Sequence, residues 1–551
     1  MVGNPNQASL VRLLLLSLTG ALVLSIIILA CTPPISRDAL THHLAVPKLY
    51  IRHGGIYEIP FIPFSYFPMN LDLLYLISLY FGSDIIPKYI HFTFALLTAF
   101  LVFSYLKRRI GRQYGLLGAA LFLSIPIIVK LSITVYVDLG LVFFSAASLL
   151  LLLKWVESGF ESKFLALSAI CCGLAMGTKY NGLITFFLLT LFVPFIHSRY
   201  SQDKNTGIVQ SLRYGALFVS IALLLFAPWM IRNYIWTGNP LYPLFDNWFN
   251  PEHPVHWHTI GLFTYRSAVY HEEWWQIALL PIRIFFEGQD GNPQYFDGRL
   301  NPFLILLPLF AFYRIGKESD IVRMELKVML CFAVLFFAFA FFSDSLRIRY
   351  ISPIIPPLVI LSIFGLRKMV LQVRALQIRL LRDMGLAAIV LIISFALWLN
   401  SRYIVNQYRY IDPFSYIGGT VTRDEYIERY RLEFPTMRYI NENLPLDARI
   451  LFLFMGNRGY YCDREYIFDM NNNKSMLKGF LKASQSTEDL LLLIQGRGIT
   501  HLLVHYRIFD RWVRDTFTAE EQEFLREFLQ KHVRLLYFKW GYGLSRLENL
   551  A

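Results

Sequence analysis

The segment SRDALTHHLAVPKLYIRHGG, residues 36–55, follows directly on an apolar run at 11–31 that is long enough to cross a bilayer. It places an aspartate, two adjacent histidines, a lysine and an arginine where the chain leaves the membrane. Ionisable groups at membrane depth are costly, so they are by default candidates for function. The segment therefore predicts a membrane protein with polar chemistry at the end of its first span.

The same segment has the pattern of a helix. Ser36 is a good N-cap, and a carboxylate at Asp38 suits the positive end of a helix. Gly54-Gly55 ends the pattern, and one apolar stripe runs along it, formed by Leu40, Leu44, Pro47 and Ile51. We expect an amphipathic helix that lies in the membrane interface with its apolar face toward lipid. In the simplest alternative, Asp38 only caps this helix and the other polar side chains face water, namely His42, His43 and Lys48.

The composition assigns most of the chain to the membrane. Of its 551 residues, 55% are hydrophobic and only 17% are charged, whereas soluble domains carry about a quarter charged residues. The formal net charge of +13 fits basic cytoplasmic loops, so we expect a lipid bilayer and no nucleic acid as partner. Only Cys462 lies in the polar C-terminal region, which excludes a disulfide within that region.

Apolar runs of about 20 residues predict about eleven membrane-spanning helices. The run at 300–313 is short. The predicted spans are 11–31, 86–106, 114–131, 138–154, 163–179, 181–197, 214–231, 300–313, 325–342, 350–366 and 384–400.

Lys and Arg fall in alternate loops, which orients these spans. The basic loops are 107–113, 154–163, 198–213, 314–327 and 367–382. By the positive-inside rule they are cytoplasmic, so the N-terminus is inside and the C-terminal region is outside. We therefore expect an integral protein of the bacterial inner membrane, with its active site and C-terminal domain on the periplasmic side. This orientation gathers four distant segments on the outer face, namely 36–55, 134–138, 177–181 and 344–350.

The chain divides near residue 400. Residues 1–400 form the predicted membrane domain, including outer loops 32–85 and 232–299, and residues 401–551 are more polar. Strand patterns at 449–456, 464–470, 500–506 and 533–540 alternate with helical patterns at 434–444, 474–497 and 518–531. This alternation predicts a small extracytoplasmic α/β domain.

Five motifs, taken in order, resemble those of GT-C glycosyltransferases, in the branch with protein O-mannosyltransferases and bacterial aminoarabinose transferases of lipid A. They are Asp38 after the first span, Asp138 in TVYVDLGLVFF, GLAMGTKYNGL (173–183), PWMIRNYIWTGNPLYP (228–243) and RYISPIIPPL (349–358). They cover roughly residues 10–400. The chain departs from the pattern at Ala39, where a glutamate is usual. It also departs at Tyr66-Phe67-Pro68-Met69, where a basic residue usually precedes proline.

The resemblance implies a membrane glycosyltransferase. Such an enzyme moves a sugar from a polyprenyl-phosphate donor to a lipid, glycan or protein on the outer face, with inversion at the sugar carbon. The acceptor hydroxyl needs a general base, and the phosphate leaving group needs cationic hydrogen-bond donors. No metal or other cofactor is expected beyond the donor substrate itself.

These requirements give each candidate residue a role. Asp38 is the candidate base, and Asp138 is a second catalytic carboxylate that orients the acceptor or the sugar. The candidate donor-phosphate ligands are Lys179, Arg232, Arg347, Arg349 and Tyr350. His42 and His43 are candidates for substrate binding.

Alternative functions make different demands on the structure. A transporter or flippase of polyprenyl-linked glycans would carry polar residues at mid-span and paired halves. A non-enzymatic scaffold would not need Asp38, Asp138 and Arg349 to converge. A further loop, PEHPVHWH at 251–258, carries His253, His256 and His258 and could bind a metal, although two prolines make it a loop by default.

Overall fold

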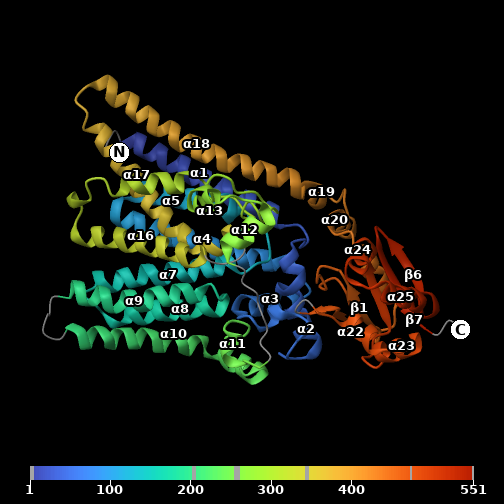
Figure 1. Cartoon of the computed structure of the whole chain (residues 1–551). Helices are drawn as coiled ribbons and strands as arrows, with labels where there is room; N and C mark the ends of the chain where they lie inside the picture. The colour runs from blue at the N-terminus through green and yellow to red at the C-terminus, as the bar shows by residue number, and fades with distance from the viewer. Residues whose placement is uncertain (1–4, 202–206, 253–260, 342–345, 472–473, 549–551) are drawn as a thin grey trace.

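The computed structural model describes residues 5–201, 207–252, 261–341, 346–471 and 474–548. In Figure 1, a bundle of long helices makes up most of the molecule, and the C-terminal residues form a separate domain at one end of it. The short helices α2 and α3 lie between the bundle and this domain.

Each predicted span corresponds to an apolar helix. Among the described residues, eight helices are long and apolar enough to cross a membrane, and α5 and α6 meet that test only as a pair, which is bent by 66°. Pro126 opens α6 and accounts for this bend, since a proline cannot continue the hydrogen-bond ladder of α5. The helix α8 has 17 residues, and α15, the predicted short span, has nine. The predicted class of polytopic helical membrane protein is confirmed.

The helices of the bundle have the following bounds: α1 (Pro5–Ala30), α4 (Ile86–Ile110), α5 (Arg112–Ser124), α6 (Pro126–Ser132), α7 (Asp138–Glu157), α8 (Ser162–Thr178), α9 (Gly182–Tyr200), α10 (Gly207–Thr237), α15 (Phe303–Ala311), α16 (Asp320–Phe341), α17 (Ile355–Arg374) and α18 (Arg379–Ile411). The connections contain η1 (Ala39–His43), α2 (Ala45–His53), η2 (Pro63–Tyr66), α3 (Asn70–Tyr80), α11 (Asp246–Phe249), α12 (Leu262–Tyr270), α13 (Trp274–Ala278), α14 (Leu280–Arg283), η3 (Ile315–Lys317) and η4 (Ile348–Ile354).

Two glycines let the helices that end at the site pack closely. A Cβ atom at Gly173 of α8 would overlap the backbone of Ala222 in α10, and one at Gly365 of α17 would overlap the backbone of Leu307 in α15. Lipid gives spanning helices no hydrophobic drive to associate, so close packing of this kind holds them together. It fixes α8 and α17, and with them the segments 177–181 and 347–350 at their ends.

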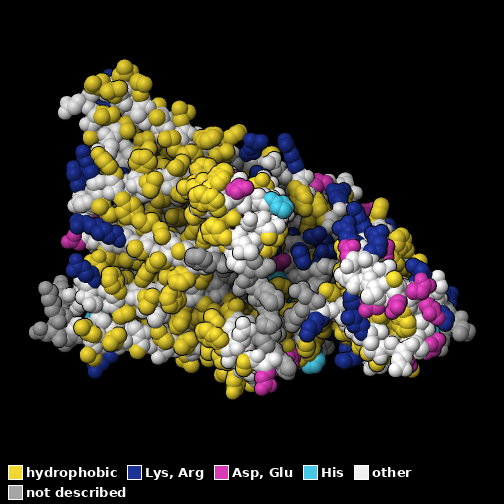
Figure 2. Space-filling view, in the orientation of Figure 1, with side chains coloured by type: hydrophobic (Ala, Val, Ile, Leu, Met, Phe, Trp, Pro, Cys, Tyr) yellow, Lys and Arg dark blue, Asp and Glu magenta, His cyan; other side chains and the backbone are white. Residues whose placement is uncertain are grey.

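The surface of the bundle suits a bilayer. Figure 2 shows hydrophobic side chains over its sides and Lys and Arg side chains at the end away from the C-terminal domain. At that end Arg109 of α4 donates hydrogen bonds of 2.9 and 2.5 Å to Glu325 of α16, which is fully buried. An apolar belt with charged ends is what a membrane imposes, and the protein is an integral membrane protein.

The segment 36–55 is helical, as predicted, but it is not a surface helix. The π-helical turn η1 leads into α2, which Gly54 ends in the left-handed conformation with φ of 80°. Residues 39–47 are all buried. The expectation of an interfacial helix with its apolar face toward lipid is therefore wrong, because α3 and the C-terminal domain cover that face. The covering side chains include Leu71, Tyr75 and Tyr460.

The C-terminal domain is α/β, as predicted, and its sheet has the strand order β2-β1-β5-β7-β6. The central strand β1 pairs in parallel with β2 and β5, and β7 pairs antiparallel with β5 and β6. The bounds are β1 (Arg449–Leu453), β2 (Glu465–Phe468), β5 (His501–His505), β6 (Val533–Lys539) and β7 (Tyr542–Leu547), with β3 (Met470–Asn471) and β4 (Lys474–Ser475) in a separate pair.

Several details of this region differ from the sequence prediction. The last bundle helix continues to Ile411, past the predicted boundary at 400. The helix predicted at 474–497 is two, because Ser486 caps a new helix through its side chain. Strand β7 and the helices α19, α20 and α24 were not predicted. The helices are α19 (Pro413–Ile417), α20 (Arg423–Tyr430), α21 (Phe434–Asn443), α22 (Met476–Ala483), α23 (Thr487–Gln495), α24 (Tyr506–Thr516) and α25 (Ala519–His532).

Candidate active site

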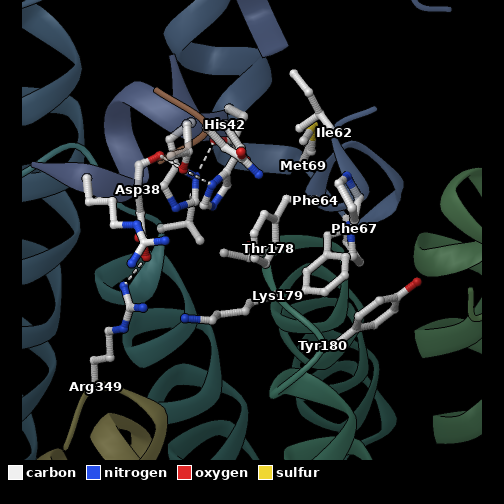
Figure 3. Close-up of a pocket in the computed structure, with 18 of the residues that line it drawn as sticks. Asp38, His42, Ile62, Phe64, Phe67, Met69, Thr178, Lys179, Tyr180 and Arg349 are labelled. Atoms are coloured by element: carbon white, nitrogen blue, oxygen red, sulfur yellow. Dashed lines mark hydrogen bonds and ion pairs between the residues drawn. The ribbon is translucent and has the colours of Figure 1, made fainter. Parts of the chain in front are cut away.

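A cavity of about 350 Å³ lies between the bundle and the C-terminal domain (Figure 3). Its walls come from η1, the region of η2 and α3, the end of α8, the start of η4, and the C-terminal sheet. Seven of the nine predicted site residues line this first cavity, namely Asp38, His42, His43, Lys179, Arg347, Arg349 and Tyr350. The fold therefore brings together side chains that the sequence scatters over more than half of the chain.

Asp38 and Arg349 form the central ion pair of the first cavity. Nη1 of Arg349 donates to Oδ2 of Asp38 at 2.6 Å, and the guanidinium lies over the rings of Tyr136 and Tyr350. The side chain of Asp38 is 21% exposed, so solvent or substrate can reach it. Burial raises the pKa of Asp38, but Arg349 and the neighbouring histidines outweigh burial and hold that pKa well below its ordinary value. Asp38 is therefore ionised, and Arg349 keeps it a weak base.

Asp138 and Lys179 form a second ion pair beside the first. Nζ of Lys179 donates to Oδ1 of Asp138 at 2.6 Å. Asp138 is fully buried at the start of α7, whereas Lys179 lines the cavity, as Figure 3 shows. Nζ also lies 5.0 Å from the ring centroid of Tyr350, which links the two ion pairs. Asp38, Arg349 and Asp138 are thus linked by a chain of contacts through Tyr350 and Lys179.

A second cavity of about 550 Å³ adjoins the first. Three charged residues, Arg37, Asp38 and Arg347, line both cavities. Arg347 lies 3.6 Å from Asp297, which also accepts a 2.9 Å hydrogen bond from Lys130. The second cavity contains further cations, Lys88, Lys130 and Arg431, and two further aspartates, Asp290 and Asp297. Asp38 is consequently the carboxylate that faces both spaces.

The two histidines after Asp38 are buried and do not face water. Nδ1 of His42 lies 2.8 Å from Oγ1 of Thr41, and its ring stacks on Phe64 with centroids 4.5 Å apart. Nδ1 of His43 lies 2.7 Å from Oδ1 of Asp72. Burial lowers the pKa of each histidine to about 3. Both rings are therefore neutral at pH 7 and can act as hydrogen-bond donors or acceptors.

Asp72 is a residue of the first cavity that sequence analysis missed. It lies in the first turn of α3, its side chain is buried, and burial raises its pKa to about 7. With His43 it forms a buried pair that shares one proton near neutral pH. Asp72 could have been found in the sequence as an aspartate inside the apolar run NLDLLYL, at 70–76. This run lies in a loop that was predicted to be outside the membrane.

Arg232 is the predicted phosphate ligand that does not line the first cavity. Its guanidinium lies over the rings of Trp229 and Trp236, at 4.6 and 4.8 Å from their centroids. It donates a 2.6 Å hydrogen bond to the backbone carbonyl of Tyr66. These contacts hold η2 against α10, so the geometry gives Arg232 a structural role. The candidate metal residues His253, His256 and His258 lie outside the described residues.

The sequence matches one known family over part of its length. The model of the dolichyl-phosphate-mannose-protein mannosyltransferase family matches residues 65–238, which run from η2 to the end of α10. No curated protein matches this chain in sequence.

The fold is similar to that of several solved structures over nearly the whole chain. ArnT from Cupriavidus metallidurans bound to undecaprenyl phosphate is 14% identical, with a TM-score of 0.55 over 98% of each chain. The apo state of the same protein is 15% identical, with a TM-score of 0.56 and the same coverage. The archaeal oligosaccharyltransferase AglB from Archaeoglobus fulgidus, in complex with an inhibitory peptide and a dolichol-phosphate, is 13% identical. Its TM-score is 0.50, over 98% of this chain and 74% of AglB. Together with the family match, these similarities confirm the predicted GT-C fold and resemblance.

Proposed function

We propose that this protein is a membrane glycosyltransferase that moves a sugar from a polyprenyl-phosphate donor to a hydroxyl group of an acceptor. The observation that carries the proposal is Asp38, which is ion-paired with Arg349 at the junction of two cavities. A reactive carboxylate beside several cations is what transfer from a phosphate leaving group requires. The mannosyltransferase family match and the fold shared with ArnT bound to undecaprenyl phosphate support the donor class.

The donor phosphate binds in the first cavity. Lys179, Arg347 and Arg349 supply positive charge there, and the Tyr350 hydroxyl can donate a further hydrogen bond. A planar guanidinium can hold two phosphate oxygens, so Arg349 is the strongest of these ligands. Asp138 acts through Lys179, which its buried carboxylate positions toward the cavity.

Donor binding also prepares Asp38 for catalysis. In the free protein Arg349 holds the pKa of Asp38 low, which makes the carboxylate a weak base. A bound phosphate gives Arg349 a second anionic partner and draws the guanidinium away from Asp38. The carboxylate is then better able to accept a proton, so the base gains strength only when the donor is present.

The acceptor reaches Asp38 from the second cavity. Its hydroxyl group gives its proton to Asp38, and its oxygen bonds to the sugar carbon. The bond between that carbon and the phosphate oxygen breaks, and polyprenyl phosphate leaves with the bonding electrons. Attack from the side opposite the phosphate inverts the sugar carbon. The acceptor is a lipid, a glycan or a protein, and the residues named here need no further cofactor.

The proposed location is the inner membrane of a bacterium, with both cavities and the C-terminal domain on the periplasmic side. The basic end of the bundle then faces the cytoplasm, as the positive-inside rule requires. The alternative, a transporter or flippase, predicts polar groups at mid-span and internal repeats. The predicted ionisable site residues instead lie at helix ends, and none of the proteins named above is a transporter.

A donor-consumption assay tests this function. The purified protein is incubated with total polyprenyl-phosphate sugars from the host, and loss of donor is followed by mass spectrometry. Asp38→Asn removes the base while keeping its size, and it should lower turnover about a hundredfold or more. Asp320→Asn is the matched control, because that side chain is 92% exposed at the opposite end of the bundle.

Each outcome has a distinct meaning. Donor loss with wild type and with Asp320→Asn, but not with Asp38→Asn, supports the proposal, and the mass lost identifies the sugar. Equal turnover by all three proteins removes Asp38 from the role of base. If wild type consumes no donor, transfer is excluded for that donor pool, and movement of labelled lipid in vesicles tests the transporter alternative.

A further inference from the structure

The C-terminal domain forms part of the first cavity. Gly456, Asn457 and Phe468 line this cavity together with the residues of the bundle. Gly456 and Asn457 belong to the loop that follows β1, and Phe468 is the last residue of β2. The carboxyl ends of two neighbouring parallel strands therefore face the ion pairs of the bundle.

This edge of the sheet has the topology of a ligand site. From β1 the chain passes first to β2 on one side, and later to β5 on the other side of β1. In open α/β sheets such a switch point leaves a crevice outside the carboxyl ends of the strands, and ligands bind there. In this protein, the loop after β1 leads from that point into the first cavity.

The loop after β1 contains several residues with positive φ. Phe454, Gly456 and Asn457 have φ values of 62°, 63° and 57°. A Cβ atom at position 456 would lie 2.6 Å from Nη1 of Arg458, which is ion-paired with the buried Glu433. Asn is among the few residues other than glycine that adopt positive φ readily. This turn places Asn457 in the lining of the first cavity.

The same loop is fastened to the segment that carries Asp38. The backbone N–H of Tyr460 donates to the carbonyl of Leu40 in η1 at 3.2 Å. Lys48 and Arg52 of α2 both reach the carboxylate of Asp463 at 2.8 Å. Asn457 therefore holds a defined position relative to Asp38, as a substrate-binding residue must.

Among the threonine and asparagine side chains of the cavity, Asn457 is the one available for a ligand. Four threonine and asparagine side chains line it, and Thr41, Thr178 and Asn181 are already bonded to backbone or side-chain atoms. The Asn457 side chain is exposed, and it makes no hydrogen bond with any other described residue. Its amide offers two donors and an acceptor, a set that matches sugar hydroxyl groups. The cations of the cavity match phosphate instead.

We propose that Asn457 is a specificity residue of the enzyme, whose side-chain amide binds hydroxyl groups of the sugar being transferred. The C-terminal domain thereby selects the donor, and the bundle supplies the phosphate ligands and the base. This inference rests on the proposed function of the first cavity.

The test compares Asn457→Ala with Asn443→Ala. Asn443 is an equally exposed asparagine of the same domain, at the end of α21 and away from the first cavity. For each protein, kcat/KM is measured with several purified polyprenyl-phosphate sugars that differ in one hydroxyl group, and donor binding is measured by native mass spectrometry. Asn457→Asp, which keeps the shape but loses both N–H donors, is the second variant.

We expect Asn457→Ala to lower kcat/KM about tenfold for the best donor and to reduce discrimination between donors, because hydrogen bonds to the sugar are lost. Asn443→Ala should behave as wild type, and Asn457→Ala should lower the unfolding temperature only slightly, because alanine adopts positive φ less readily than asparagine. Unchanged kcat/KM and unchanged donor ranking in Asn457→Ala overturn the inference and leave the proposed function intact. Failure of wild type to bind or consume any donor overturns both.

Discussion

Arg349 and Asp38 are separated by 311 residues in the chain and by 2.6 Å in the structure. Asp38 precedes η1 near the N-terminus, and Arg349 belongs to η4, just before α17. Their contact lies beside the first cavity and gives the buried Arg349 guanidinium an anionic partner. The pair is therefore part of the folded structure and, in the proposed reaction, the part that the donor phosphate rearranges.

Donor binding should require both the positive charge and the planar shape of the Arg349 guanidinium. Arg349→Lys keeps the positive charge but loses the planar guanidinium, and we expect kcat/KM to fall about tenfold. Arg349→Met removes the charge and should lower kcat/KM about a hundredfold or more. Steady-state kinetics over a range of donor concentrations measures both effects. Wild-type kinetics in Arg349→Met would exclude it as a phosphate ligand.

Lys179 and Asp138 allow stability and function to be separated. Lys179→Met leaves the fully buried Asp138 carboxylate without its cation, and we expect a loss of about 3–5 kcal/mol in the free energy of unfolding. Adding Asp138→Asn removes the buried charge and should restore most of the stability, as measured by thermal unfolding in detergent. Donor turnover should stay low in the double variant, because the cavity still lacks the positive charge of Lys179. Recovery of turnover would show that Lys179 only supports the fold.

His42 should make the folded state sensitive to acid. The pKa of this histidine is about 3 in the folded protein and about 6.5 when unfolded, so unfolding takes up a proton between these values. Its contribution to stability is complete above pH 6.5 and falls by about 1.4 kcal/mol for each pH unit below it. Thermal unfolding between pH 4 and pH 8 measures the slope. His42→Phe keeps the stacking on Phe64 and should make the slope shallower.

His43 and Asp72 should add little to the pH dependence of stability. On unfolding, His43 takes up a proton and Asp72 releases one, so the two effects cancel. Between about pH 4 and 6.5 the unfolded pair carries one proton on His43, and the folded pair carries one on Asp72. Asp72→Asn removes the compensation and should make stability fall more steeply as pH decreases. His43→Gln leaves only the raised pKa of Asp72, which favours the folded state at low pH and should flatten the curve. Identical pH curves for both variants would contradict the pairing.

Arg232 should matter for stability and not for the donor. Arg232→Met removes the hydrogen bond to the Tyr66 carbonyl and the contacts with two tryptophans, and we expect a loss of about 1–3 kcal/mol in the free energy of unfolding. The KM for the donor should remain close to that of wild type. A large increase in KM, in a variant that unfolds at the wild-type temperature, would return Arg232 to the donor site.

The sequence by itself determined the membrane fold and pointed to seven of the residues that line the first cavity. Apolar runs as long as a bilayer is thick have one stable form, the helix, so the spans could be placed from hydropathy alone. Aspartate, lysine and arginine at the ends of such runs are costly without a function, which is why Asp38, Lys179 and Arg349 stood out. Their motifs also matched an enzyme family in order.

The tertiary structure alone decided which of these residues meet and what surrounds them. The surroundings of His42 and His43 depend on Phe64 and on Asp72 of α3, which no local pattern joins to segment 36–55. Asp72 and Asn457 resemble ordinary loop residues in sequence, and only the packing of distant segments brings them into the cavity. Arg232, like Arg349, is an arginine near the end of an apolar run. The rings of Trp229 and Trp236 hold its guanidinium, and it does not line the first cavity. Hydropathy is a local property of the chain, whereas a cavity is made by contacts between segments hundreds of residues apart.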